Sequence, residues 1–338
     1  MRVQNSRFRR GENVKSMIGH TRRFAASASG GIAIGTLVLF VICWLFAPQS
    51  ISPGAIRGMI PFVSVLILVA IGQTLVIQQG GIDLSVPGVI SLAGVMTAMG
   101  WSNDGIPELA VLAAVAGMGI ASGLVAGLLV TRLSVAPIVS TLGINTLLYG
   151  FNMAISGGTP AAAMPGLIAF ANIRVMGVSV VLAIAVAATL IVAFVIKKTA
   201  VGRRFEFVGA NARVGRAAGI PEANYKIAAY VASGFLSACA GALLAGIMQS
   251  PSAFQGDEYL MASIAAVVLG GTSLLGGSGN FLATTIAVVF LSQLRQFVLT
   301  TGAPVGVQFL FQGAAILIGV AVYLVDFRAL FRRSPRRA

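Results

Sequence analysis

Few residues of this chain could carry out covalent chemistry. His20 is the only histidine and lies in a polar tail, while Cys43 and Cys239 sit in two separate apolar stretches, where we expect no disulfide. Asp83 is the one carboxylate inside a strongly hydrophobic environment. An enzyme site needs a nucleophile, a metal cluster or an acid–base pair gathered in one pocket. We therefore expect no catalytic residue, no metal site and no cofactor in this chain.

A short basic helix is predicted within the most polar segment of the chain. Asn211 is suited to capping the start of a helix and Gly219 to ending it, which gives about two turns over residues 212–218. Arg213 and Arg216 are three residues apart and therefore share a face. Such a helix could dock in a groove of a cytoplasmic protein. The alternative is a solvated loop whose charges follow the positive-inside rule.

Two glycine-rich breaks interrupt the apolar pattern, at residues 78–88 and 269–279. Each joins an inward-running helix to an outward-running one, and paired breaks of this kind point to a translocation pathway. Irregular backbone is tolerated near a membrane only where protein or water satisfies its polar groups. Two ordinary cytoplasmic turns are the alternative. The candidate translocation or gating residues within the breaks are Gly80, Gly81, Asp83, Ser85, Gly270, Gly271 and Thr272.

The acidic side chain in the first break has two interpretations. Asp83 or Ser85 could cap the helix that follows, with Pro87 near its first turn, and an anionic group there complements the helix dipole. Alternatively, Asp83 acts directly in gating or substrate passage, because an ionisable residue at membrane depth is a functional candidate.

The elements that must position these residues are membrane helices. Of the 338 residues, 57% are apolar and only 9% are charged, a profile of polytopic membrane proteins. A crossing needs roughly 20 apolar residues, so the long stretches without charge predict an all-α membrane protein with ten helices. The predicted spans are 30–47, 58–78, 84–101, 109–131, 135–155, 178–196, 227–248, 259–274, 280–300 and 305–325.

The distribution of basic residues predicts the orientation and the domain boundaries. With Arg132, 20 of the 23 Lys and Arg residues fall on one face, which marks the cytoplasmic side and places both termini there. We expect a basic tail over 1–29, a transmembrane domain over 30–326 and a second basic tail over 327–338. A cytoplasmic insert, 197–226, interrupts the transmembrane domain. The basic residues flank helices without interleaved aromatics, so we expect anionic lipid and not nucleic acid as their partner.

The opposite face carries few charges. Asp104, Glu108, Asp257 and Glu258 are expected in its loops, and Arg295 lies toward the outer end of the ninth span. Snorkelling to the interface explains an arginine at that position. The outer charges could contact a soluble partner or could simply be solvated.

Four separated motifs resemble the permease subunits of ribose-type ABC sugar importers. They occur in order and with similar spacing over residues 55 to 325: GGIDLS at 80–85, VGANARVGRAAGI at 208–220, the Lys226, Tyr230, Ser233-Gly234 run, and AAVVLGGTSLLGGSG at 265–279. The resemblance implies the ABC importer permease fold, a permease dimer, a cytoplasmic ATPase dimer, and a periplasmic binding protein that delivers a monosaccharide or related polyol. It also implies that a helix near 209–220 contacts the ATPase, through Gly209, Asn211, Arg213, Arg216 and Gly219.

The sequence leaves two other function classes besides an ATP-driven importer. The chain has no G-x-x-x-x-G-K-[ST] loop, so a separate subunit would have to bind ATP. An ion-coupled secondary transporter of a small solute is the alternative, although proton coupling normally uses ionisable residues in the membrane and only Asp83 is at hand. A membrane-embedded enzyme lacks the residues to build its site.

Overall fold

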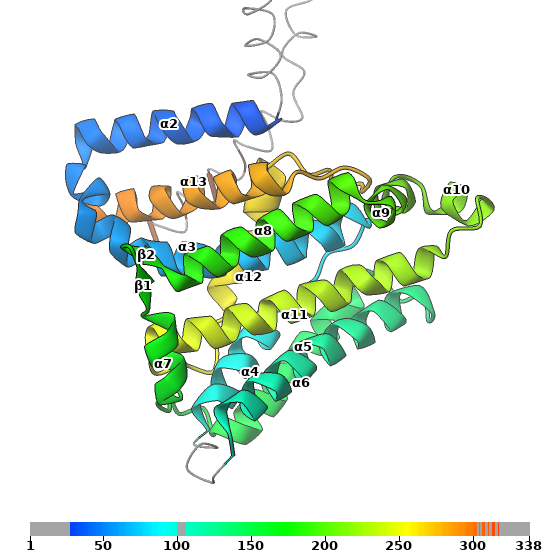
Figure 1. The fold of residues 1–338 in the computed structure, drawn as a ribbon, viewed down its shortest axis with the longest axis horizontal. Helices are drawn as coiled ribbons and strands as arrows, with labels where there is room; N and C mark the ends of the chain where they lie inside the picture. The colour runs from blue at the N-terminus through cyan, green and yellow to red at the C-terminus, as the bar shows by residue number, and fades with distance from the viewer. Residues whose placement is uncertain are drawn as a thin grey trace, which may run out of the picture.

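The chain folds into a bundle of apolar helices. The computed structural model describes residues 28–99 and 106–302, with scattered positions between 304 and 317. Within this part, seven helices are long and apolar enough to cross a membrane. Figure 1 shows several of them lying side by side along the length of the molecule. They are α2 (Ala28–Phe46), α3 (Pro53–Gln78), α5 (Glu108–Thr131), α6 (Pro137–Ser156), α8 (Val180–Lys198), α11 (Glu222–Met248) and α13 (Phe281–Thr300).

Two predicted spans are shorter than the sequence suggested. α4 (Val86–Ala98) and α12 (Asp257–Leu269) have 13 residues each. At about 1.5 Å per residue each covers about 20 Å, less than the roughly 30 Å of a bilayer core. The predicted tenth span and both basic tails lie wholly or largely outside the described residues, as does Asp104. The ten-helix count therefore stays a prediction.

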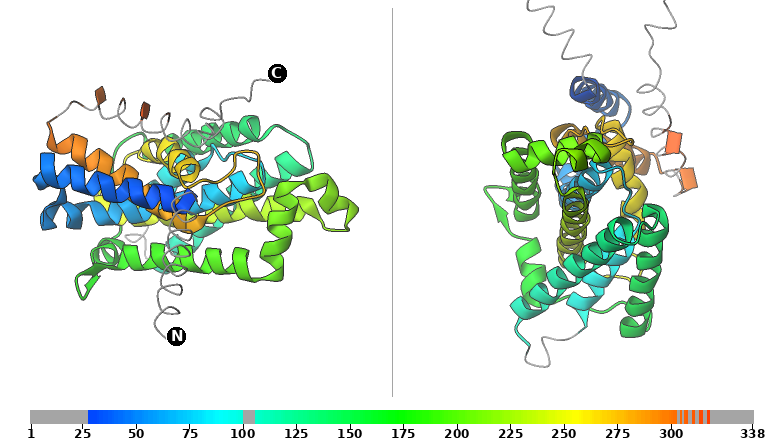
Figure 2. Two further views of the ribbon diagram at one scale, coloured as in Figure 1. Left: turned by 90° about the horizontal axis from the view of Figure 1, so that it is seen from above. Right: turned by 90° about the vertical axis from the view of Figure 1, so that its right-hand side faces the viewer.

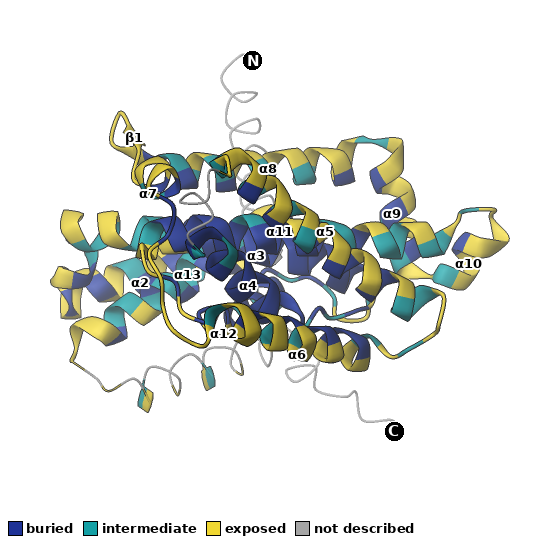
Figure 3. Cartoon of the chain, turned by 90° about the horizontal axis from the view of Figure 1, so that it is seen from below, coloured by how far each residue is buried: buried dark blue, intermediate teal, exposed yellow. Residues whose placement is uncertain are grey.

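Helix α3 forms the centre of the bundle. Every residue from Val63 to Gln78 is buried, and Figure 3 shows α3 dark blue among outer helices with large exposed faces. The long helix α11 packs beside it and also against α5. There Gly119 lies on the backbone of Gly234, and Gly123 on the backbone of Tyr230. Small residues let membrane helices approach closely, which explains glycines at these positions.

Several short elements were not predicted. They are η1 (Pro48–Ile51), α7 (Pro165–Ala171), β1 (Arg174–Val175), β2 (Val178–Ser179) and α9 (Ala200–Ala210). The two strands form an antiparallel hairpin in which Arg174 pairs with Ser179. Figure 2 shows this hairpin and α7 at the opposite end of the molecule from α10 (Ala212–Ala217). The bounds of α10 confirm the helix predicted at 212–218 to within one residue.

Candidate functional site

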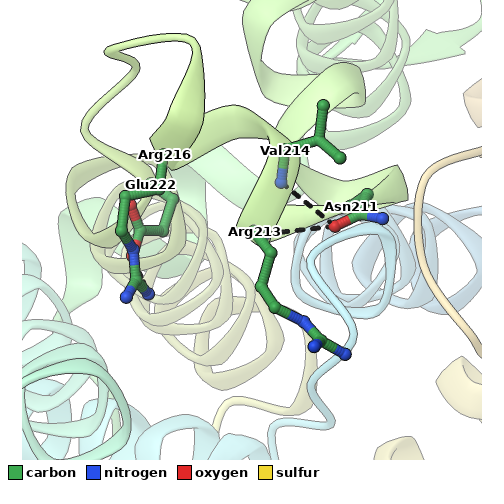
Figure 4. Close-up of polar contacts among 5 residues, drawn as sticks. All are labelled: Asn211, Arg213, Val214, Arg216 and Glu222. Carbon is green, nitrogen blue, oxygen red and sulfur yellow. Dashed lines mark hydrogen bonds and ion pairs between the residues drawn. The ribbon is translucent and has the colours of Figure 1, made fainter.

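The short helix α10 owes its start and its end to the residues expected there. The Asn211 side-chain oxygen accepts hydrogen bonds from the backbone N–H groups of Arg213, at 3.1 Å, and Val214, at 3.2 Å. Both donors would otherwise be unsatisfied in the first turn of the helix. Gly219 has φ +73°, a left-handed conformation that ends a helix and favours glycine. Figure 4 shows the cap and the side chains that leave this helix.

The two arginines of α10 have different surroundings. The Nε and Nη2 atoms of Arg216 lie 2.7 and 2.5 Å from Glu222 Oε1, on the first residue of α11. Arg213 has no ion pair within the described part of the chain, and Figure 4 shows its side chain pointing away from the Arg216–Glu222 pair. Val214 is half exposed on the same helix. Arg213, Val214 and Arg216 are all exposed to a partner, but only Arg216 is held by an ion pair within the described residues.

Helix α9 attaches α10 to the membrane helices. Its first turn is capped by Thr199 Oγ1, which accepts from the N–H of Gly202 at 3.1 Å. Lys197 at the end of α8 forms an ion pair with Glu206 of α9 at 2.5 Å. Buried Gly215 of α10 packs on Val208 of α9. These contacts link α10 through α9 to the end of α8.

The structure brings this module against both glycine-rich breaks. A Cβ on Gly209, near the end of α9, would clash with the carbonyl oxygen of Gln78, the last residue of α3. The same carbonyl oxygen accepts a hydrogen bond from the N–H of Gly277 in the second break, at 2.9 Å. Gly276 and Gly277 have φ +91° and +85°, conformations that require glycine. Three segments distant in sequence thus meet at one backbone carbonyl.

A second contact holds α9 on the end of α3. The Gln79 side-chain nitrogen donates to the carbonyl oxygen of Phe205 at 2.8 Å. Phe205 is itself buried, and Gln78 is buried with no hydrogen-bond partner for either side-chain amide atom. Gly279 leaves room for the Gln78 side chain, because a Cβ at that position would overlap it. We call Gln78, Gln79, Phe205, Gly209, Gly276, Gly277 and Gly279 the coupling junction.

Asp83 lies deeper in the bundle, where it joins the first break to α11. One carboxylate oxygen accepts from the N–H of Ser85, at 3.0 Å, and from its hydroxyl, at 2.5 Å. The other oxygen accepts from the Ser233 hydroxyl at 2.7 Å. The expected side-chain cap on α4 is not formed, because Asp83 accepts from the N–H of Ser85, the residue before the helix, and not from an N–H of its first turn. The bond to Ser233 adds a connection between helices that the sequence did not predict.

The remaining candidate residues are packed against neighbouring helices or set the turns. A Cβ on Gly81 would meet the Tyr230 hydroxyl, and one on Gly270 would meet the backbone of Thr284 at 2.7 Å. Gly80 and Gly271 have φ +75° and +77°. Thr272 is buried, and its hydroxyl has no hydrogen-bond partner. Close packing or turn geometry thus accounts for the glycines of both breaks.

Sequence reasoning missed Gln78, Phe205 and Ser233 as contact residues. Ser233 stood in a motif that carried the family resemblance, but nothing in its spacing indicated a partner. Gln78 contributes through its backbone carbonyl, which any residue has, so residue type gave no signal. The clustering of glycines at 276, 277 and 279 was the one available hint, since glycine often marks close backbone approach.

Comparison with known proteins gives consistent matches over most of the chain. Residues 55–320 match the family described as branched-chain amino acid transport system / permease component. The ribose import permease protein RbsC of Bacillus subtilis (strain 168) is 34% identical over 298 residues, which cover 86% of this chain and 91% of that protein. The fructose import permease protein FruF of Bifidobacterium longum (strain NCC 2705) is 33% identical, with 80% of each chain covered.

A third relative has a different named substrate. The autoinducer 2 import system permease protein LsrD of Escherichia coli O9:H4 (strain HS) is 33% identical over 261 residues, 75% of this chain and 78% of its own. No solved structure matches the chain.

Proposed function

The chain belongs to the family described as branched-chain amino acid transport system / permease component, and from this premise we propose that it forms the membrane path for a monosaccharide or related polyol in an ATP-driven importer. It is a permease subunit and a multi-pass protein of the bacterial plasma membrane. Membership also implies an ATPase and a substrate-binding protein as partners. We propose that this chain carries no catalytic site or cofactor and that the ATPase binds the ATP.

The relatives' names favour a sugar over an amino acid. Ribose, fructose and autoinducer 2 are the substrates named for the three relatives described above. The family description names branched-chain amino acids, so leucine is the second candidate substrate. A periplasmic binding protein would select the substrate, and the ribose-, xylose-, arabinose- or galactose-like sugars remain the proposed class. The secondary-transporter alternative is not favoured, because the named relatives are import-system permeases.

The coupling junction is the observation that carries the proposed mechanism. An ATPase that moved α10 would move α9, and Gly209 would then press directly on the Gln78 carbonyl to which Gly277 is bonded. Force applied to one short helix would thus reach both breaks. Gly209, Asn211, Arg213, Arg216 and Gly219 are the proposed coupling residues, and alternating access would follow from rocking of the two permease halves.

This mechanism requires a particular orientation and assembly. We propose that the insert 197–226 and both termini are cytoplasmic, and that the tails 1–29 and 327–338 contact anionic lipid. The domain 30–326 would pair with a second copy or with a similar permease. The exposed apolar faces of α2 and α8 fit lipid contact.

Uptake by the reconstituted complex tests the proposal. The chain would be assembled in proteoliposomes with its ATPase and its binding protein, and uptake of labelled ribose, fructose and leucine would be compared. We expect uptake of a sugar that stops without ATP and resists an ionophore. Sugar uptake that an ionophore abolishes and ATP depletion spares would overturn the ATP-driven mechanism. Uptake of leucine alone would overturn the proposed substrate class.

A further inference from the structure

A stretch of irregular backbone connects α11 to α12. Residues 249–256 are not helical, and α12 begins only at Asp257. α12 ends next to the second break, where Gly270 packs on Thr284 in the first turn of α13. α12 is about 20 Å long, so a helix with one end at the second break on one side of the bilayer does not extend across a core of roughly 30 Å. Figure 1 shows α12 inclined across the long helices, which shortens its reach further.

If the second break lies at the inner membrane surface, the start of α12 falls within the bilayer core, and Asp257 and Glu258 are then not in the outer loops where the sequence suggested them. A Cβ on Gly256 would clash with the backbone of Pro87 in the first turn of α4, and its N–H donates to Ser91 Oγ at 3.0 Å. Asp257 is exposed in this chain. Glu258 and Arg295 form an ion pair at 2.8 Å in which each side chain is about half exposed.

Exposed charges within the bilayer core would show whether the surface around Asp257 faces lipid or water. Ionisable side chains within a membrane face the protein interior or a water-filled cavity, because contact with lipid costs too much free energy. Irregular backbone obeys the same restriction. The surface around Asp257 thus faces water or another subunit, in contrast to the apolar exposed surface of α8, where Leu190 and Phe194 lie.

Helix α6 holds this surface in place with one face. Asn145, Tyr149 and Asn152 follow the i, i+4, i+7 spacing of a helix face. Asn145 accepts a hydrogen bond from the N–H of Gly88 at 2.7 Å, the Tyr149 hydroxyl donates to Asp257, and Asn152 donates to the carbonyl oxygen of Ala253 at 2.5 Å.

Two aromatic rings stand beside the carboxylate. Tyr149 and Phe254 have ring centroids 5.2 Å apart and planes tilted by 56°. Phe254 is half exposed and Tyr149 partly so. Nearby, Asn152 and Gln255 are at least nine-tenths buried, yet Oδ1 of Asn152 and both side-chain amide atoms of Gln255 have no hydrogen-bond partner. These atoms lie beneath the exposed surface and not on it.

We propose that Asp257, Tyr149 and Phe254 form a contact surface for a polyhydroxylated ligand on the translocation path. A carboxylate accepts hydrogen bonds from sugar hydroxyls, and an exposed aromatic face covers the apolar C–H face of a sugar ring. The surface binds without a metal and is open on one side, as passage requires. This inference rests on the proposed function, because it takes a sugar as the transported solute.

Water accessibility tests the surface directly. Phe254→Cys would be introduced into the full complex in proteoliposomes and treated with a charged, membrane-impermeant thiosulfonate, with and without D-ribose. We expect labelling that ribose slows. The unaltered chain, which carries Cys43 and Cys239, gives the background. Leu190→Cys on the exposed face of α8 is the matched control and should not react. Absence of labelling at position 254 in every nucleotide state overturns the proposal. Formation of disulfide-linked permease dimers through the introduced thiol, instead of labelling, would overturn it as well.

A conservative variant tests the chemistry. Asp257→Asn keeps an oxygen for the Tyr149 hydroxyl and removes the charge. We expect maximal ribose uptake to fall about tenfold, as for loss of a hydrogen bond to a charged group, with ATP hydrolysis retained. Unchanged uptake in a complex that carries ribose overturns the contact surface alone. Transport of leucine and no sugar by the unaltered complex would overturn the proposed function as well.

Discussion

The N–H of Gly277 donates to the carbonyl oxygen of Gln78 over 2.9 Å, so the loop between α12 and α13 is bonded to the last residue of α3. The two residues are far apart in the sequence and belong to the two glycine-rich breaks. Gly209 of α9 packs on the same oxygen atom. A helix outside the bundle is therefore in direct contact with both interruptions of the membrane spans.

This contact predicts that Gly209→Ala uncouples the transporter. The added methyl group would overlap the Gln78 carbonyl oxygen, and overpacking of this kind costs about 1–3 kcal/mol. We expect ribose uptake to fall about 5- to 150-fold for a displacement of that energy, while the ATPase still co-purifies. Uptake and co-purification from the same membranes check this. Gly35→Ala is the control, since nothing lies within 4 Å of its added Cβ.

Charge reversal on α10 should act at an earlier step. Arg213→Glu with Arg216→Glu removes the available cation and breaks the bond to Glu222. We expect loss of both coupled uptake and ATPase association. A double reversal at Lys198 and Arg132, which are exposed outside α10, gives the same change in net charge and should retain both activities. Normal co-purification of the ATPase with the α10 variant would contradict the proposed docking site.

The two arginines should also differ when each is truncated alone. Arg216→Ala removes an exposed ion pair, and such pairs contribute only about 0–1 kcal/mol, so we expect a modest loss of uptake. Arg213→Ala leaves every described ion pair intact. Its loss should nevertheless weaken ATPase binding more, as measured by titration of the ATPase against permease in nanodiscs. Equal affinities for the two variants would count against Arg213 as the main contact.

The first break can be tested by a pair of substitutions that should compensate each other. Gly81→Ala would force a methyl group onto the Tyr230 hydroxyl and should lower the thermal stability of the purified protein. Tyr230→Phe removes that hydroxyl, which is buried without a partner, and should cost little. The double variant should be more stable than Gly81→Ala alone. Additive effects in thermal unfolding would show that the two residues do not interact.

Asp83→Asn separates the structural role of this residue from a gating role. An asparagine amide has one oxygen, so it cannot accept hydrogen bonds from both the Ser85 and the Ser233 hydroxyl. We therefore expect the free energy of unfolding to fall by about 1–3 kcal/mol. If the carboxylate only joins the break to α11, uptake per folded molecule should stay within about twofold of normal. Thermal unfolding and uptake would be measured on one preparation. Lost uptake at unchanged stability would instead assign Asp83 to gating.

Much of the membrane bundle could be predicted because bilayer thickness imposes a length on apolar segments. The ends of α3, α5, α8 and α13 fall within a few residues of the prediction, apart from the longer start of α3. The caps at Asn211 and Gly219 could also be predicted, because local backbone geometry depends on those residue types.

Tertiary contacts could not be predicted in the same way. A charge-free stretch shows that a helix is apolar but not whether it crosses the membrane alone, so α4 and α12 were assigned too great a length. The junction at Gln78 depends on backbone atoms, which carry no sequence signal. Likewise, nothing near Asp257 in the sequence indicated its bond to Tyr149, because the two residues are 108 positions apart.

Photocrosslinking from α10 tests the central claim most directly. A photoreactive amino acid would replace Val214, the half-exposed residue beside Arg213, in the complete complex in inside-out membranes. The account predicts a crosslink to the ATPase subunit whose yield changes when ATP and vanadate trap the ATPase. A crosslink to the periplasmic binding protein, or no ATPase adduct in any nucleotide state, would contradict it.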